Sequence, residues 1–267
     1  IVGCGSNIVV IDKNNTIYLT INGINRLQIW FNGNVNSAKN MSSGLTGPQG
    51  LFIRENGDIF VDNGANSRVE KWTVNASSGV SAMTVSSKCF SLFVDNNDAL
   101  YCMQQSPRSV YKRSLNSSSL TPTTVTGATS FSNAHGIFVD VNFNLYIADY
   151  ANNQIKCVAA GASTATVAVG SSAPAPRNFA LNNPIAVMLD GNGYFFILEY
   201  GNHRLLAENS TGFRCIVGCS GAGGAAANQL TTPYSFSFDT NGNIFIADQG
   251  NCRFQKFFHE TNFCGIS

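Results

Sequence analysis

The chain has 267 residues, of which 44% are hydrophobic and only 12% are charged. A chain of this length and composition can bury a full core, which excludes an intrinsically disordered segment. Its 16 basic and 15 acidic residues give a net charge of +1, which disfavours a protein whose main task is holding nucleic-acid phosphates. The apolar runs are short and interrupted, so we expect no membrane span. The chain begins at Ile1 without an initiator Met or a basic leader, as expected of a processed product or of a domain cut from a longer protein.

Six segments in chain order share one template: an alternating apolar run that ends in a turn, a second apolar run, and a loop that ends near an arginine. The segments cover residues 7–30, 49–72, 90–113, 135–158, 185–208 and 234–257. Successive turns begin 42, 41, 45, 50 and 49 residues apart, at Asp12, Arg54, Asp95, Asp140, Asp190 and Asp239. A period of about 40 to 50 residues that holds several short strands is the size of one four-stranded propeller blade.

The turn chemistry agrees with this period. Residues 190–193 read Asp-Gly-Asn-Gly and residues 239–242 read Asp-Thr-Asn-Gly, each between runs rich in Phe, Val, Ile and Tyr. Such sequences are typical of β-hairpins. Each unit therefore predicts strand a before the turn, strand b after it, strand c around the arginine and strand d in the stretch that follows.

The fifth unit carries a signature where strand c begins, because residues 202–205 read Asn-His-Arg-Leu. They resemble the core of the NHL repeat, and residues 190–201 match the rest of its consensus. The equivalents are residues 66–68, 152–154 and 251–253, whereas the first unit keeps only Arg26 and the third departs to Pro-Arg-Ser at 107–109. The resemblance covers the whole chain and implies one all-β domain over residues 1–267, a closed six-bladed β-propeller of four-stranded blades and of the extracellular type. The units lie near residues 7–47, 48–88, 89–132, 133–182, 183–231, and 232–267 together with 1–6.

The two ends of the chain predict how the ring closes. Residues 216–219, in the outer strand of the fifth unit, read Ile-Val-Gly-Cys, and residues 1–4 repeat them. The preceding half of that strand resembles residues 261–264. We therefore expect residues 1–4 and 262–267 to lie together at the outer edge of blade 6, where they would remove an open sheet edge.

Eight cysteines follow the same correspondence. The predicted bridges are Cys4–Cys264, Cys89–Cys102 and Cys215–Cys219, while Cys157 and Cys252 are left unassigned. An even number of cysteines in a chain with few charges favours disulfides and an oxidising compartment. We expect a secreted protein or an extracellular domain of a larger one.

Five glycosylation sequons begin at Asn14, Asn40, Asn75, Asn116 and Asn209. Chance alone would give a similar number in a chain this rich in asparagine, so only their positions are informative. Four of the five fall in a–b or c–d turns, which share the bottom face of a propeller, and Asn40 falls near the end of the first strand d. Glycans there would shield the bottom face and leave the top face bare.

The residue just before each strand a is expected to surround the mouth of the central channel on the top face. This position is occupied by Asn7, Gln49, Phe90, His135, Ile185 and Tyr234. A similar NHL-like enzyme family, the peptidyl-α-hydroxyglycine amidating lyases, has zinc-binding histidines at this position in three blades. Catalytic zinc needs about three protein ligands and one open position. Because only His135 fits here, we expect no metal and no cofactor.

Other motifs have ordinary structural explanations. His203 belongs to the repeat signature, His259 falls in a c–d turn, and the glycines at 221–224 are not followed by a phosphate-binding helix. The acids and arginines of the b–c loops recur in too many units to form one site, so we expect them to fasten those loops. The turn aspartates indicate hairpins rather than calcium sites, and the scattered basic residues disfavour nucleic-acid binding.

The residues together favour a non-enzymatic extracellular recognition or assembly module that binds a protein or glycan partner through its top face. The expected surface comprises the channel mouth and the long d–a loops at 171–183 and 219–233. Two alternatives remain open. One is a lyase or hydrolase that uses the same mouth, either without zinc or like the amidating lyases. The other is a structural glycoprotein of a matrix or filament, which self-association through Cys157 or Cys252 would favour. We expect no direct insertion into a membrane.

Overall fold

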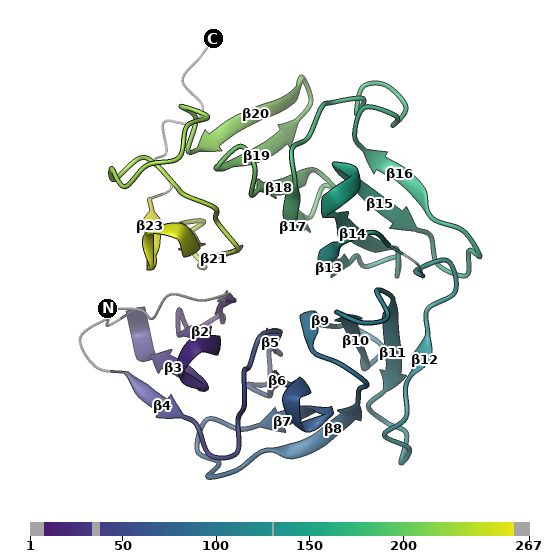
Figure 1. The fold of residues 1–267 in the computed structure, drawn as a ribbon, viewed down its shortest axis with the longest axis vertical. Helices are drawn as coiled ribbons and strands as arrows, with labels where there is room; N and C mark the ends of the chain where they lie inside the picture. Colours follow the sequence, from purple (N-terminus) through teal and green to yellow (C-terminus); the bar gives the residue numbers. More distant parts are fainter. Residues whose placement is uncertain (1–7, 34–37, 130, 259–267) are drawn as a thin grey trace.

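The computed structural model describes residues 8–33, 38–129 and 131–258 as six antiparallel sheets around a central axis (Figure 1). Each sheet is formed by strands that are consecutive in the chain, so each sheet is one blade. The predicted all-β six-bladed propeller is therefore confirmed. Among the described residues no helix is long and apolar enough to cross a membrane.

The strands follow the predicted a, b, c, d order from the axis outwards. Blades 1 and 2 contain β1 (Val9–Ile11), β2 (Ile17–Ile21), β3 (Arg26–Trp30) and β4 (Lys39–Met41), then β5 (Leu51–Ile53), β6 (Ile59–Asn63), β7 (Arg68–Trp72) and β8 (Val80–Thr84). Blades 3 and 4 contain β9 (Cys89–Val94), β10 (Ala99–Gln104), β11 (Val110–Ser114) and β12 (Thr123–Thr124), then β13 (Ala134–Val139), β14 (Leu145–Asp149), β15 (Gln154–Val158) and β16 (Thr166–Val169). Blades 5 and 6 contain β17 (Pro184–Leu189), β18 (Phe195–Glu199), β19 (Arg204–Asn209) and β20 (Gly212–Val217), then β21 (Ser235–Phe238), β22 (Ile244–Asp248) and β23 (Arg253–Phe257).

The a–b hairpins owe their shape to one side chain. In five blades an aspartate closes the turn: its Oδ1 accepts hydrogen bonds of 2.8–2.9 Å from the backbone N–H groups two and four residues later. A side chain that imitates a backbone turn in this way is why Asp and Asn dominate such positions. Blade 2 has Arg54 instead, and there Asn56 Oδ1 accepts from the backbone N–H of Asp58 at 3.0 Å.

The b–c loops carry short 3₁₀ turns and are fastened by a second repeated acid. The 3₁₀ turns are η1 (Asn22–Ile24), η2 (Phe31–Gly33), η3 (Gly64–Asn66), η4 (Tyr150–Asn152) and η5 (Gln249–Asn251), of which only η2 lies outside a b–c loop. At the end of β22, Asp248 Oδ2 accepts from Arg253 Nε at 2.8 Å and from Asn251 Nδ2 at 2.8 Å. Its Oδ1 accepts from the backbone N–H of Thr231 at 2.7 Å. The repeated acids and arginines therefore hold the loops, as the sequence predicts.

The core is divided between the blades. Six apolar clusters each join two neighbouring blades, and one of them joins blade 6 to blade 1 through Phe245, Ala247, Val9 and Leu19. The innermost strands also contact one another around the whole ring, from β1 to β21 and back to β1. Where β21 meets β1, the N–H of Val9 donates to Ser235 Oγ at 2.9 Å. The ring is therefore closed by packing, and the predicted closure by residues 1–4 and 262–267 lies outside the described residues.

Two of the predicted disulfides are confirmed. Cys89–Cys102 joins β9 to β10, and Cys215–Cys219 joins β20 to the loop that follows it. Cys252 also takes part in a disulfide, and Cys157 carries a free, half-buried thiol. The predicted Cys4–Cys264 bridge lies outside the described residues.

Candidate functional site

A cavity of about 410 Å³ opens on the top face of the ring, at the mouth of the central channel. Five of the six residues predicted for this mouth line the cavity and form what we call the floor: Gln49, Phe90, His135, Ile185 and Tyr234. The sixth, Asn7, lies outside the described residues. A second group, which we call the rim, completes the lining: Asn22, Lys88, Gln105, Asn133, Tyr150, Tyr200 and Gln249.

The floor is buried and bonded to itself. Gln49, Ile185 and Tyr234 are only 5%, 2% and 7% exposed. Gln49 Nε2 donates to Tyr234 Oη at 2.7 Å, and Tyr234 Oη lies 3.4 Å from His135 Nδ1. The His135 ring also packs on Phe90, with centroids 4.3 Å apart. The floor residues therefore support one another, and a ligand would meet the rim first.

Five of the seven rim residues come from a repeated position that was not among the predicted site residues. Each of Asn22, Gln105, Tyr150, Tyr200 and Gln249 is the first residue after a strand b, directly following the end of β2, β10, β14, β18 or β22. The sequence could have indicated three of them, because Tyr150, Tyr200 and Gln249 directly follow the repeated loop acids at 149, 199 and 248.

Blade 2 departs from this pattern, and its departure makes room for Lys88. Its residue after strand b is Gly64, where an added Cβ would lie 2.4 Å from the Cα of Lys88. Only glycine lets the two backbones approach this closely. Lys88 comes from the connection before β9, two residues ahead of Phe90, and it supplies the charged group in the lining.

Burial shifts the pKa of two side chains in the cavity, His135 and Tyr150, and keeps both of them uncharged near pH 7. Burial, and to a smaller extent the nearby Arg108, lowers the pKa of His135 to about 4, so its imidazole is uncharged. Burial and the neighbouring Tyr200 raise the pKa of Tyr150, which keeps that phenol protonated. The rings of Tyr150 and Tyr200 lie 5.6 Å apart, centroid to centroid.

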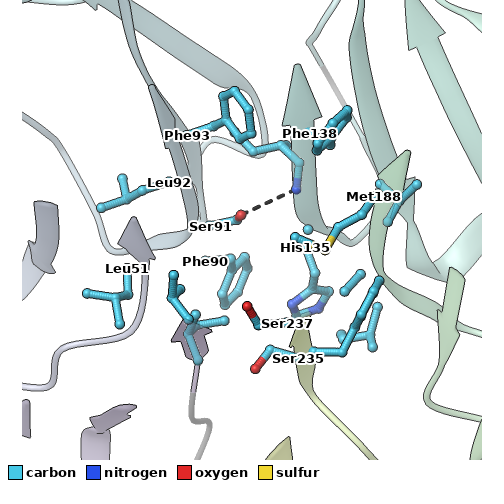
Figure 2. A pocket seen from close by; sticks show the side chains of 18 of the residues that line it. Leu51, Phe90, Ser91, Leu92, Phe93, His135, Phe138, Met188, Ser235 and Ser237 are labelled. Atoms are coloured by element: carbon cyan, nitrogen blue, oxygen red, sulfur yellow. Dashed lines mark hydrogen bonds between the residues drawn. The ribbon is translucent and has the colours of Figure 1, made fainter. Parts of the chain in front are cut away.

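Below the mouth, the channel becomes narrow and apolar. Its cavity of about 120 Å³ is lined by the inner strands (Figure 2), where the backbone N–H of Ile137 donates to Ser91 Oγ at 3.3 Å. Gly136 allows the close approach of two blades, since an added Cβ would lie 2.7 Å from the carbonyl oxygen of Ile185. Further down, the ring of Phe93 packs against that of Phe138, 5.3 Å away between centroids. The mouth is thus a polar cup above a tightly packed apolar channel.

His203 does not line the cup. His203 has a left-handed backbone (φ 54°), and its Nδ1 accepts from the backbone N–H of Thr232 at 3.0 Å, which fastens the loop after β20. His259 lies outside the described residues. Across the described part of the chain, no group of three or more His, Cys, Asp or Glu side chains is placed to hold a metal ion.

Four sequons lie on the face opposite the cup, because a–b and c–d connections leave the strands at the other end. Asn14 is in the β1–β2 turn, Asn75 and Asn116 are in c–d turns, and all three are exposed. Asn209 ends β19 and is half-buried, with its Oδ1 accepting from the N–H of Thr211 at 2.9 Å. Asn40 is exposed in β4.

No family model matches the chain, and no curated protein matches it significantly. Solved structures do share its fold. An auxiliary nutrient binding protein from Bacteroides ovatus is 14% identical with a TM-score of 0.76, covering 97% of this chain and 70% of its own. A streptogramin B lyase is 16% identical with a TM-score of 0.63, covering 93% and 77%. A structure of a nidogen/laminin complex is 11% identical with a TM-score of 0.61, covering 95% and 94%. At these identities the likeness shows the six-bladed propeller fold alone, and propellers of this fold include both binding proteins and a lyase.

Proposed function

We propose that the protein is a non-enzymatic extracellular recognition module that binds a protein or glycan partner through the cup on its top face. One observation carries the proposal: at equivalent positions of successive blades, different uncharged side chains converge on a single cavity of about 410 Å³. Small-molecule and glycan sites typically have volumes of about 300–1,000 Å³ and a few convergent polar groups.

The chemistry of the cup supports binding more than catalysis. A general acid or base works best when its pKa lies near the operating pH, and burial holds the pKa of His135 at about 4. His135 faces Phe90, Tyr150 and Tyr234 rather than a carboxylate. The described lining instead offers amides and phenols, which recognise a partner by hydrogen bonds.

The fold relatives and the cysteines are consistent with an extracellular role. Chains that share this fold occur in an auxiliary nutrient binding protein and in a nidogen/laminin complex. Two disulfides within blades, and a third that includes Cys252, suit an oxidising compartment. Glycans at Asn14, Asn75 and Asn116 would cover the opposite face and leave the cup accessible.

The proposal is tested by binding to an immobilised panel of extracellular matrix proteins and glycans. We expect the double variant Tyr150→Ala/Tyr200→Ala to lose at least about tenfold in affinity for whatever the wild type captures, because central aromatic side chains carry much of the energy of an interface. The matched control is Val141→Ala/Asn142→Ala, in an exposed turn of the bottom face, and it should bind normally.

Two outcomes would contradict the proposal. Binding that survives the Tyr150→Ala/Tyr200→Ala change but fails in the turn control would place the partner on the bottom face. A captured glycan or peptide that is chemically altered on incubation with the wild type, and not with the double variant, would favour the lyase or hydrolase alternative.

A further inference from the structure

The polar side chains of the b–c loops and those of the rim differ in whether other residues of the protein already satisfy their hydrogen bonds. The repeated loop amides belong to the first group, as Asn251 shows by donating to both Asp248 and the carbonyl of Gly224. The rim belongs to the second. Within the described part of the chain, none of the seven rim side chains makes a hydrogen bond or an ion pair with another residue: Asn22, Lys88, Gln105, Asn133, Tyr150, Tyr200 and Gln249.

The rim therefore presents a dense set of unused donors and acceptors. Four carboxamides each offer two N–H donors and one carbonyl acceptor, and two phenols each offer a hydroxyl. In addition, the Oε1 atom of Gln249 is buried and accepts no hydrogen bond within the described structure. A ligand that satisfies such a set must itself carry many closely spaced hydroxyl or amide groups, because each unsatisfied buried polar group costs about 1–3 kcal/mol.

The aromatic surfaces add an apolar component at the same depth. The ring of His135 contacts the rings of both Phe90 and Tyr150, and the ring of Tyr150 in turn contacts that of Tyr200. A molecule that combines hydroxyl groups at its edges with C–H faces matches both features, and this combination is typical of a saccharide ring.

The charge of the cup selects among saccharides. No carboxylate is among its described lining residues, and Lys88 has no ion-pair partner among the described side chains. Arg108 is exposed nearby, close enough to His135 to disfavour its protonation. The carboxyl of Asp62 is fully buried, and burial raises its pKa to about 7, while the charge of Lys88 acts in the opposite direction. Lys88 and Arg108 place positive charge on the blade 3 side of the cup.

We propose that the cup binds the terminal residue of an acidic saccharide, carboxylated or sulfated, with its anionic group at Lys88 and its ring against Tyr150 and Tyr200. This inference rests on the proposed recognition function and names the class of ligand. The rim carboxamides hold the hydroxyl groups, and Lys88 supplies the preference for an anion.

The test compares matched pairs of probes by titration calorimetry: sialyllactose against lactose, a glucuronate-terminated oligosaccharide against its glucose-terminated counterpart, and a sulfated disaccharide against the unsulfated one. We expect at least one acidic probe to bind about tenfold or more tighter than its neutral partner, since a hydrogen bond to a charged group contributes about 1.5–3 kcal/mol. The three pairs distinguish carboxylate from sulfate.

The informative variant is Lys88→Gln, which keeps the length of the side chain and removes its charge. It should bind the acidic and the neutral probe equally, whereas the matched control Lys112→Gln, exposed on strand c of blade 3 (β11), should keep the wild-type preference. The preference should also weaken as salt rises, because exposed charges are screened over about 10 Å at 0.1 M ionic strength.

The outcomes separate this inference from the proposed function. Equal binding of acidic and neutral probes by the wild type, or an acid preference that survives Lys88→Gln, would overturn the acidic-saccharide inference. So would the capture of a protein, and of no saccharide, through Tyr150 and Tyr200, yet that result would leave the recognition function standing. Only partner binding that is indifferent to Tyr150→Ala/Tyr200→Ala would overturn both.

Discussion

The two ends of each blade use polar residues differently. On the bottom face, five blades repeat the same aspartate, and each of these carboxylates bonds to the backbone of its own turn. On the top face, the first residue after strand b changes from blade to blade, from Asn22 to Tyr150 to Gln249, and these side chains are not bonded within the described protein. Polar residues that repeat from blade to blade and have satisfied hydrogen bonds are thus the ones that the fold requires. Polar residues that vary at an equivalent position and are not hydrogen-bonded are available to a ligand.

Two neighbouring residues provide the strongest test of that contrast. Asp248→Ala should destabilise the protein by about 3–5 kcal/mol, because Arg253 and the N–H of Thr231 would lose a buried, charged partner. Gln249→Ala, one residue further on, should change stability by less than about 0.5 kcal/mol, as expected of a side chain that no fold contact requires. Urea unfolding measures both. Similar losses for the two variants would remove the distinction between a structural loop acid and a rim residue.

Asp62 belongs to neither group, because it is an acid that does not repeat between blades and yet is fully buried. Equivalent positions hold Thr20 in blade 1 and Ala247 in blade 6. Burial raises the pKa of Asp62 from 3.8 to about 7, so the folded state keeps its proton to a higher pH than the unfolded state does. Stability contributed by this group is therefore present below about pH 4 and lost as the pH rises to about 7, by up to about 4 kcal/mol.

The variant Asp62→Asn cannot ionise and should lack that loss. Urea unfolding at pH 5 and at pH 8 should show that the free energy of unfolding of the variant increases relative to that of the wild type as the pH rises. If both proteins keep the same difference at the two pH values, Asp62 does not titrate in this range.

His135 should make the free energy of unfolding depend on pH in the opposite direction. Burial lowers the pKa of its imidazole from 6.5 to about 4, so stability is present above about pH 6.5 and lost as the pH falls through about 4, by up to about 3 kcal/mol. The variant His135→Gln should lack this acid-side loss. The measurement is the unfolding free energy at pH 7 and pH 4.5, and an unchanged difference between the two pH values in the variant would show that His135 is not the group responsible.

The smallest expected effect concerns the bottom face. Asp190→Ala removes the acceptor for the N–H groups of Asn192 and Tyr194, which should cost about 1 kcal/mol, the magnitude of a lost side-chain cap. The variant should bind every partner of the wild type unchanged. A loss of binding without a loss of stability would instead assign the ligand to the bottom face.

The sequence predicted the architecture and five members of the cup because repeats fix both the strand order and the position that faces the mouth. It did not predict that those five form a buried floor. Gln49 and Tyr234 bond across the channel although 185 residues separate them, and no local pattern encodes such a contact. The rim was missed for another reason: the residue after each loop acid differs in type between blades, so the position was not recognised as repeated although the loop acids mark it. The disulfide that includes Cys252 was left open because the repeats offered that cysteine no equivalent.

The central claim, that partners bind at the cup, is tested most directly by hydrogen–deuterium exchange with and without the tightest-binding member of the saccharide and matrix-protein panel. Binding at the rim should slow exchange in the connections that follow β2, β10, β14, β18 and β22, and leave the turns at Asp140 and Asp190 unchanged. Protection of those bottom turns, with the top connections unaffected, would contradict the account.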